Sequence, residues 1–247
     1  MYATAQAFWL TLLLLLPTAL HAQEPLHLGT FSNTHSPVLH VCERVLREAY
    51  AKLGRSIVVE HLPAERALYW ASSGRLDGDL CRGHASEGLL LVPTAVYYWQ
   101  LGVFSTRPLS VQTWSDLQPY KIAYERGMSV ISAHQELDLL PVNSIQSGIQ
   151  LLANNRVDIL LDDYNSVLYA ARKMKVNDLL ASQPKLARGP TYHLLNKKHA
   201  VLARQLNAVL AQMTSDGRIE QIEQKVMAEF MLEAEQEDTA PLAADNQ

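Results

Sequence analysis

Arginine residues stand at two points where an apolar run of the chain gives way to a turn or a helix. Arg82 directly follows the strand-like run 76–81, and Arg66 lies at the expected start of a helix. A guanidinium binds a carboxylate through two parallel hydrogen bonds, so both arginines are candidates for holding an acidic ligand group. A cation at a helix start is unfavourable unless an anion faces it, and the alternative for Arg66 is a salt bridge with Glu65 or another neighbouring acid.

The second half of the chain offers candidates of both charges. Arg126 and Ser129 flank a glycine turn at another expected helix start, where backbone N–H groups and a hydroxyl suit an anion; a plain capped turn is the alternative. Asp162 and Asp163 end an apolar run, where a carboxylate, and that of Asp163 in particular, could accept hydrogen bonds from a ligand ammonium. Its alternative role is that of an N-cap for the helix that follows.

Polar and aromatic side chains near strand ends could complete such a site. Phe31 and Asn33 follow the first expected strand, and in an open α/β sheet ligands bind beyond the carboxyl ends of the strands. Tyr98, between Tyr97 and Trp99, could form an aromatic wall, although tyrosines in such a position are as often part of the core. A small molecule with polar groups is the ligand class that these residues suit.

The sequence lacks the motifs of metal sites and of common catalytic or phosphate-binding sites. Asp77, Asp79 and Asp158 do not have a recognised metal-ligand spacing, and the nine histidines include no His-x-x-x-His pair on an expected helix. The sequence also has no Gly-x-Ser-x-Gly motif and no phosphate-binding loop. We therefore expect no metal, no cofactor and no catalytic residues.

Strand-like and helix-like patterns alternate along the chain and place the candidate residues at strand ends. The first half predicts strands at 26–31, 57–59 and 76–81 and helices at 38–53 and 64–73, which end at Gly54 and Gly74. The pattern restarts with strands at 121–124, 157–161 and 192–195 and helices at 145–154, 165–174, 202–213 and 219–230. Such alternation predicts parallel strands with right-handed crossovers.

Both ends of the chain differ from the rest. Residues 8–16 form an apolar run followed by Ala22, which predicts a signal peptide over residues 1–22, although residues 1–7 carry no Lys or Arg. A buried N-terminal helix or a retained anchor is the alternative, but the run is short against about 30 Å of hydrocarbon. Residues 232–247 carry five acids and no base, without apolar periodicity, so we expect a disordered tail.

The composition is that of an ordinary globular protein. The 247 residues are 48% apolar and 19% charged, which suits two lobes of about 100 residues or one larger domain. The net charge of −4 gives no reason to expect nucleic acid as a partner, and a monomer is expected. Cys42 and Cys81 could form a disulfide in an oxidising compartment or be small buried side chains.

Short fragments spread over residues 26–231 carry a resemblance to a known family. They are Pro63-Ala64-Glu65-Arg66-Ala67-Leu68, Ser73-Gly74-Arg75-Leu76-Asp77, Ala95-Val96-Tyr97-Tyr98, Trp114-Ser115-Asp116-Leu117, Lys121-Ile122-Ala123, Leu152-Ala153-Asn154-Asn155-Arg156-Val157-Asp158 with Asp163 after it, and Ser215-Asp216-Gly217. In this order and spacing they resemble the family 3 extracellular solute-binding proteins of bacteria, periplasmic receptors best known from polar amino-acid uptake.

The resemblance implies a type II periplasmic-binding-protein fold, in which two Rossmann-like α/β lobes are joined by two crossover strands, here near 101–106 and 186–191. One lobe would comprise residues 23–104 and 189–231 and the other residues 105–188, with the ligand between them. Asp163 stands where the family binds the ligand's amino group.

The chain also departs from the family's pattern. Amino-acid-binding members commonly have a Thr-x-x-Arg segment after the third strand, whose arginine holds the ligand carboxylate. Here the chain reads Leu80-Cys81-Arg82-Gly83, and that arginine has no match. The loop after the first strand is also short and lacks the usual aromatic-rich segment, so both departures bear on the ligand class.

Three hypotheses of function follow. The first is a periplasmic solute-binding protein, not an enzyme, that brings an amino acid or related small acid to the membrane permease of an ABC transporter. The second is a protein whose closed form a membrane receptor senses. The third is a dehydratase-like enzyme on the same fold, which would need Asp163 or His35 as a general acid–base.

Overall fold

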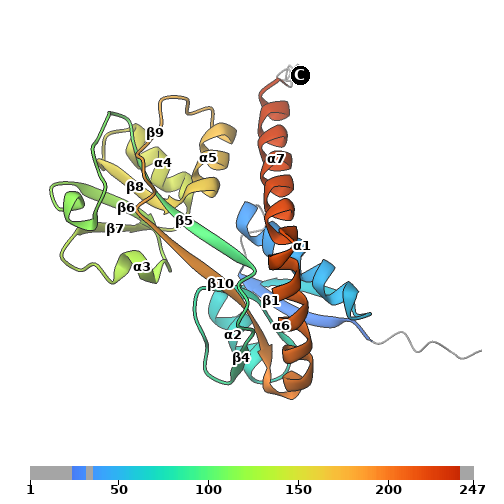
Figure 1. Ribbon diagram of the computed structural model, residues 1–247. Helices are drawn as coiled ribbons and strands as arrows, with labels where there is room; N and C mark the ends of the chain where they lie inside the picture. Colours follow the sequence, from blue (N-terminus) through green and yellow to red (C-terminus); the bar gives the residue numbers. More distant parts are fainter. Residues whose placement is uncertain (1–23, 32–35, 240–247) are drawn as a thin grey trace, which may run out of the picture.

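Two α/β lobes joined by a pair of long strands make up the molecule, as Figure 1 shows. This computed structural model describes residues 24–31 and 36–239, with Phe31 and residues 236–239 described by their backbone alone. The expected signal peptide and Asn33 lie outside the described residues. The strands form one curled 10-stranded sheet in the order β2-β1-β3-β10-β5-β8-β6-β7, with β4 on β10 and β9 on β5.

The first lobe has the expected parallel strands, because β1 pairs in parallel with both β2 and β3. Its elements are β1 (Leu26–Phe31), α1 (Pro37–Lys52), β2 (Ile57–Leu62), α2 (Ala64–Ser72), β3 (Gly78–Arg82), β4 (Leu89–Leu91), the 3-10 turn Lys197–His199, α6 (Ala200–Ser215) and α7 (Arg218–Thr239). The expected strands and helices of this half are confirmed, whereas the short β4 was not foreseen.

Helix α1 illustrates how the sequence sets an element. Pro37 begins the helix, where its missing N–H leaves no hydrogen bond unmade. Val41, Val45 and Leu46 recur at helical spacing, and all three are fully buried against the sheet and the last helices. Gly54, with a φ of 68°, ends the segment in a left-handed conformation that glycine adopts readily.

The second lobe repeats the arrangement, with β6 pairing in parallel with β7 and β8. Its elements are the 3-10 turn Trp114–Leu117, β6 (Lys121–Glu125), α3 (Ser129–Ser132), β7 (Asp138–Val142), α4 (Ile145–Ala153), β8 (Ile159–Asp163), α5 (Tyr164–Lys173) and β9 (Leu180–Ala181). Every residue of β8 is buried, which the apolar run up to residue 161 predicts for its first three residues but not for Asp162 and Asp163. The edge strand β7 was missed because it is half exposed and contains Pro141.

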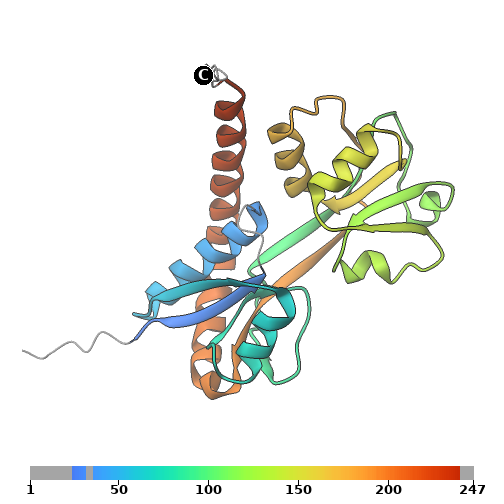
Figure 2. The same ribbon diagram turned by 180° about the vertical axis from the view of Figure 1, so that it is seen from behind.

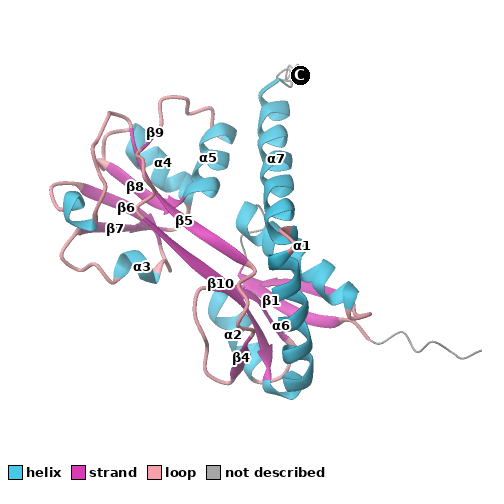
Figure 3. Ribbon diagram, viewed as in Figure 1, coloured by secondary structure: helices cyan, strands magenta, loops and turns pink. Residues whose placement is uncertain are grey.

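The lobes are joined by β5 (Tyr97–Ser105) and β10 (Ala187–Asn196), which pair antiparallel from Tyr97 with Thr191 to Leu101 with Ala187. Further along, β5 pairs with β8 of the second lobe, and β10 pairs with β3 of the first. Figure 3 shows these two strands running from one lobe into the other. The expected crossovers at 101–106 and 186–191 fall largely within them.

A disulfide joins Cys42 on α1 to Cys81 on β3, which decides between the two alternatives for these cysteines. Their Cα atoms lie 6.4 Å apart, and both residues are buried within the core of the first lobe. The bond therefore fastens α1 to the end of β3, directly beside Arg82.

Helix α7 corrects the expectation of a disordered tail from residue 232. The helix continues to Thr239, and residues 240–247 lie outside the described residues. Ala234 is 1% exposed and belongs to the core of the first lobe, so packing extends the helix where the local pattern of the sequence does not. In the described part of the chain, no helix is long and apolar enough to cross a membrane.

Candidate functional site

Parallel pairing places the carboxyl ends of β1, β2 and β3 along one edge of the first lobe and those of β6, β7 and β8 along one edge of the second. The candidate residues stand at or just after these ends. Phe31 ends β1, Arg66 lies in α2 after β2, and Arg82 ends β3. In the second lobe Arg126 follows β6, and Asp163 ends β8.

Arg82 is paired with an aspartate of its own strand. Its Nε donates to Oδ1 of Asp79 at 2.9 Å, and its Nη2 donates to Oδ2 at 2.8 Å. The Asp79 side chain is fully buried and that of Arg82 is 14% exposed. Burial raises the pKa of Asp79, and the guanidinium offsets part of that rise. The bidentate contact expected with a ligand carboxylate is thus made with the carboxylate of Asp79.

Arg66 is the exposed arginine of this edge. It lies in the first turn of α2, and among the described residues it makes no ion pair, so the alternative salt bridge with Glu65 does not form. Nη2 of Arg82 also donates to the carbonyl of Ala64 at 3.4 Å, which brings the two arginines to the same helix start.

Asp163 forms the N-cap that was its alternative role. Oδ1 accepts from the N–H of Ser166 at 3.0 Å and from its hydroxyl at 2.9 Å. Oδ2 accepts from the N–H of Gln100 at 3.4 Å and from the hydroxyl of Tyr97 at 3.5 Å, both on β5. The residue is 6% exposed, and burial raises the pKa of its carboxyl while these hydrogen bonds lower it. Asp163 therefore ties the second lobe to a crossover strand.

Further carboxyls lie near Asp163: those of Asp162, its neighbour at the same strand end, and those of Glu125 and Glu223, which could not be singled out from the sequence. Asp162 is 2% exposed and accepts from the N–H groups of Asp163 at 2.8 Å and Glu125 at 3.1 Å. Burial, followed by the charge of Glu125, raises the pKa of Asp162. Glu223 of α7 also has a raised pKa, through burial and then the charge of Asp163. In the sequence, the adjacent Asp162 and Asp163 at a strand end indicated such a cluster of carboxyls. Nothing in the sequence indicated that Glu223 of α7 would lie near them.

Arg126 and Ser129 are both exposed at the start of α3. The N–H of Arg126 donates to Val142 at 2.9 Å and that of Met128 to Glu125 at 3.4 Å, so these two backbone groups are used within the lobe. Helix α3 spans Ser129–Ser132 only, so few peptide dipoles align along it. The anion site expected at this helix start stays a prediction.

Tyr98 is 40% exposed on β5, and the guanidinium of Arg188 on β10 lies 4.1 Å from its ring centroid. Its neighbour Tyr97 is buried and donates to Asp163. Of the two tyrosines that the sequence could not separate, Tyr97 thus belongs to the core and Tyr98 to the surface of the crossover. The described residues contain no group of three or more His, Cys, Asp or Glu placed to hold a metal ion.

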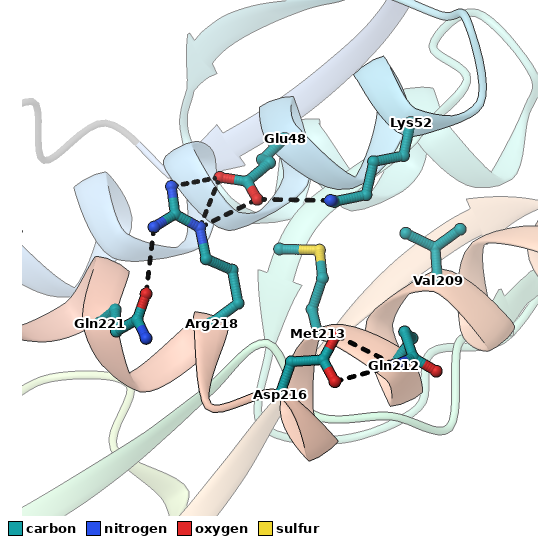
Figure 4. A pocket seen from close by; sticks show the side chains of 8 residues that line it. All are labelled: Glu48, Lys52, Val209, Gln212, Met213, Asp216, Arg218 and Gln221. Carbon is teal, nitrogen blue, oxygen red and sulfur yellow. Dashed lines mark hydrogen bonds and ion pairs between the residues drawn. The ribbon is translucent and has the colours of Figure 1, made fainter.

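A separate depression of about 440 Å³ lies on the first lobe between α1, α6 and α7, as shown in Figure 4. Arg218 binds Glu48 through Nε and Nη2 there, with the shortest distance at 2.8 Å, and Lys52 lies 3.8 Å from the same carboxylate. None of the candidate binding residues lines it.

Comparisons with known proteins place the chain by its fold. No family model matches the sequence. An uncharacterized protein of Shewanella oneidensis is 26% identical over 220 residues, which cover 81% of each chain.

Solved structures are similar over most of their length. The ligand-binding core of GluR0 in complex with L-glutamate has a TM-score of 0.70 at 15% identity, covering 83% of this chain and 98% of that one. A histidine kinase sensor domain similar to periplasmic binding proteins has a TM-score of 0.68 at 16% identity, covering 83% and 96%. The arginine-binding protein of T. maritima, as a P235GK mutant, has a TM-score of 0.64 at 14% identity, covering 82% and 95%. At these identities the likeness shows the fold alone.

Proposed function

Because the chain has the type II periplasmic-binding-protein fold expected from its sequence, we propose that it binds a small polar ligand, an amino acid or related acid, between its lobes. The observation that carries the proposal is the placement of charged candidates from both lobes at the carboxyl ends of strands, on either side of the β5–β10 pair. Rotation about such a pair of strands is a common way for two lobes to enclose a ligand.

The assignment of roles follows from which charges already have protein partners. Arg66, exposed and without an ion pair among the described residues, is the main contact for an acidic ligand group. Arg82, whose guanidinium binds Asp79, adds positive charge near Arg66. Its hydrogen bond to the carbonyl of Ala64 positions the start of α2. Asp163 attracts a ligand ammonium toward the junction of the second lobe with β5. Phe31, Asn33, Tyr98, Arg126 and Ser129 complete the proposed lining.

Export to the periplasm and delivery to an ABC-transporter permease are the finer part of the proposal. The likeness to the substrate-binding protein of an amino acid ABC transporter, with a TM-score of 0.61, supports them. A sensing role, in which a membrane receptor reads the ligand-bound form, is the second candidate, because the histidine kinase sensor domain is at least as similar. A dehydratase-like enzyme with Asp163 or His35 as general acid–base is the less supported candidate, because the similar solved structures are binding proteins and a sensor domain.

A thermal-shift screen of residues 23–247 against amino acids, polyamines and small carboxylates tests ligand binding. A ligand at a hundredfold excess over its Kd adds about 2.7 kcal/mol, which raises the Tm of a chain this size by several degrees. We expect Arg66→Ala to reduce the shift given by a carboxylate ligand. The exposed Arg156→Ala is the matched control and should leave the shift unchanged. A screen without any shift would contradict the proposal.

Asp163→Asn tests the second lobe. The amide keeps an acceptor for the cap of α5 but removes the negative charge, so binding of an ammonium ligand should weaken by tenfold or more, corresponding to about 1.5–3 kcal/mol for a hydrogen bond to a charged group. Asp178→Asn, at an exposed position of the same lobe, is the control. Equal affinity of both variants, measured by calorimetry, would remove Asp163 from the site.

Co-purification from membrane extracts separates transport from sensing. The tagged protein should retain a permease subunit under the transport hypothesis and a receptor with a signalling domain under the sensing hypothesis, in each case only with ligand present. Turnover of a cyclic acid by the concentrated protein would instead favour the enzymatic hypothesis.

A further inference from the structure

Helix α7 begins in the first lobe and continues beside the second. It packs along α1, which belongs to the first lobe, and then along α5, which belongs to the second. Figures 1 and 2 show from opposite sides that its C-terminal half extends past α1 and runs next to α5. The lobes are therefore connected by a packed helix in addition to β5 and β10.

An apolar contact across the lobes lies at the centre of this arrangement. The ring of Phe230 on α7 meets His40 of α1 edge-on at 4.8 Å and Tyr169 of α5 edge-on at 4.9 Å. Phe230 is 7% exposed and Tyr169 4% exposed. Tyr169, although it comes from the second lobe, is thus part of the hydrophobic core of the first, together with Ala234 of α7.

Charged side chains extend the contact toward the end of α7. Glu233 lies 3.6 Å from Nζ of Lys173 and accepts from the hydroxyl of Tyr169 at 3.4 Å. Arg172 lies 3.3 Å from Glu235, and the same guanidinium contacts the sulfur of Met231 at 3.4 Å. One turn before Glu233, Glu229 pairs with Arg44 of α1. The acids of α7 therefore face bases from both lobes.

We propose that α7 is a strap that holds the two lobes in the arrangement seen here and must release α5 when the lobes rotate. The strap consists of residues 229–235 and their contacts with Tyr169, Arg172 and Lys173. Helix α7 is fixed to the first lobe through α6 and α1, so any rotation of the second lobe about β5 and β10 carries α5 past it. The strap is a property of the chain without ligand and can be tested whether or not the proposed ligand site exists.

The primary test measures the distance between lobes in the ligand-free protein. Both native cysteines are in the disulfide, so spin labels on cysteines introduced at Val201 and Gln135, exposed in opposite lobes, report interlobe distance by pulsed electron resonance. We expect Tyr169→Ala to broaden the distance distribution. The control is Tyr120→Ala, which also removes a tyrosine ring from the second lobe but at a position away from α7. This variant should keep the narrow distance distribution of the wild type. An unchanged distribution in folded Tyr169→Ala would overturn the proposal.

Reversing the charges of Lys173 and Glu233 tests the proposal independently, in case Tyr169→Ala does not fold. Lys173→Glu and Glu233→Lys should each raise the amide exchange rate of residues 229–235 by about two- to fivefold, the range expected for losing a partly exposed ion pair. Combining the two restores opposite charges and should return the rate toward that of the wild type. A double variant that exchanges as fast as the faster single variant would show that α7 is not held by α5.

Discussion

At the scale of single residues, the charged candidates differ in how far the protein itself already uses them. Arg82 and Asp79 form a two-pronged pair in a buried setting, and Asp163 receives donors on both oxygens. Arg66 and Arg126 remain exposed at the strand ends of opposite lobes. We therefore expect substitutions in the first group to change stability as well as the proposed ligand binding, and those in the second to change the proposed binding alone.

The Arg82–Asp79 pair predicts a non-additive effect on stability. Arg82→Met leaves the fully buried Asp79 carboxylate without its cation and should cost about 3–5 kcal/mol. The double variant Asp79→Leu with Arg82→Met removes both charges and should be less destabilised than Arg82→Met alone. Urea denaturation at pH 7 measures both, and additive losses would show that the two charges are not coupled.

Asp77 predicts a dependence of stability on acid pH. Burial would raise the pKa of its carboxyl, but hydrogen bonds from Lys198, His199 and the backbone of His27 outweigh it and hold the pKa at about 2. Because this pKa lies below that of the unfolded chain, near about 3.9, the stabilisation is present above about pH 4 and is lost as the pH falls to about 2.

Comparing the free energies of unfolding of the wild type and Asp77→Asn measures the size of this effect. The wild type should be more stable by about 1–2 kcal/mol at pH 6, after allowing for screening at a partly exposed site. The difference should vanish toward pH 2, as measured by urea denaturation at a series of pH values. A constant difference over this range would mean that the charge of Asp77 contributes nothing.

At the scale of elements, close contacts between strands and helices fix the edge that carries the candidates. The disulfide holds α1 against β3, and β10 crosses so near to β3 that only glycine fits at the start of β3. A side chain at Gly78 would meet the carbonyl oxygen of Leu194, a backbone atom that cannot move aside alone. These contacts determine where Arg82 stands.

The packing of β3 on β10 predicts that Gly78→Ala destabilises the protein. The added methyl forces the two strands apart, which should cost about 1–3 kcal/mol. Gly83→Ala, five residues on, meets nothing within 4 Å and is the matched control with little or no expected loss. If Gly78→Ala and Gly83→Ala were equally stable in urea denaturation, β3 and β10 could move apart without a loss of free energy.

The disulfide predicts a dependence on redox conditions. Its removal in Cys42→Ala with Cys81→Ala should cost about 2–4 kcal/mol, because the bond closes a loop between residues separated by 39 positions. A reductant that reaches the bond should lower the Tm of the wild type and leave that of the double variant unchanged. Reduction of the bond, verified by thiol titration, without any change in Tm would show that packing alone holds α1 to β3.

At the scale of the whole molecule, two lobes that share β5, β10 and α7 predict binding with a change of shape. A ligand found in the thermal-shift screen should bind once per chain, because one pair of strand edges forms the proposed site. It should also reduce the radius of gyration as the lobes close. Calorimetry gives the stoichiometry and small-angle scattering the radius. A second equivalent site, or binding without compaction, would contradict closure of the lobes around the ligand.

The sequence by itself determined the elements and through them the fold. Apolar periods of two and 3.6 residues, together with stops such as Gly54, are local properties, so the strands and helices near residues 26–82 and 121–174 could be predicted. Their alternation predicted parallel strands in two α/β units, and the resemblance to the solute-binding proteins implied two lobes joined by crossover strands. The same reasoning put Arg66 at a helix start and Arg82 and Asp163 at the ends of strands, where the structure has them.

Only the tertiary structure decided which partner each side chain takes. The hold of Arg82 on Asp79, the contact of Asp163 with Tyr97 and the bond between cysteines depend on where distant segments pack. Residues 232–239 show the reason most clearly, because no local apolar period marks them as helical. Burial of Ala234 and the bases of α5 that face the acids of α7 stabilise the helix there, and neither can be read from a local stretch of sequence.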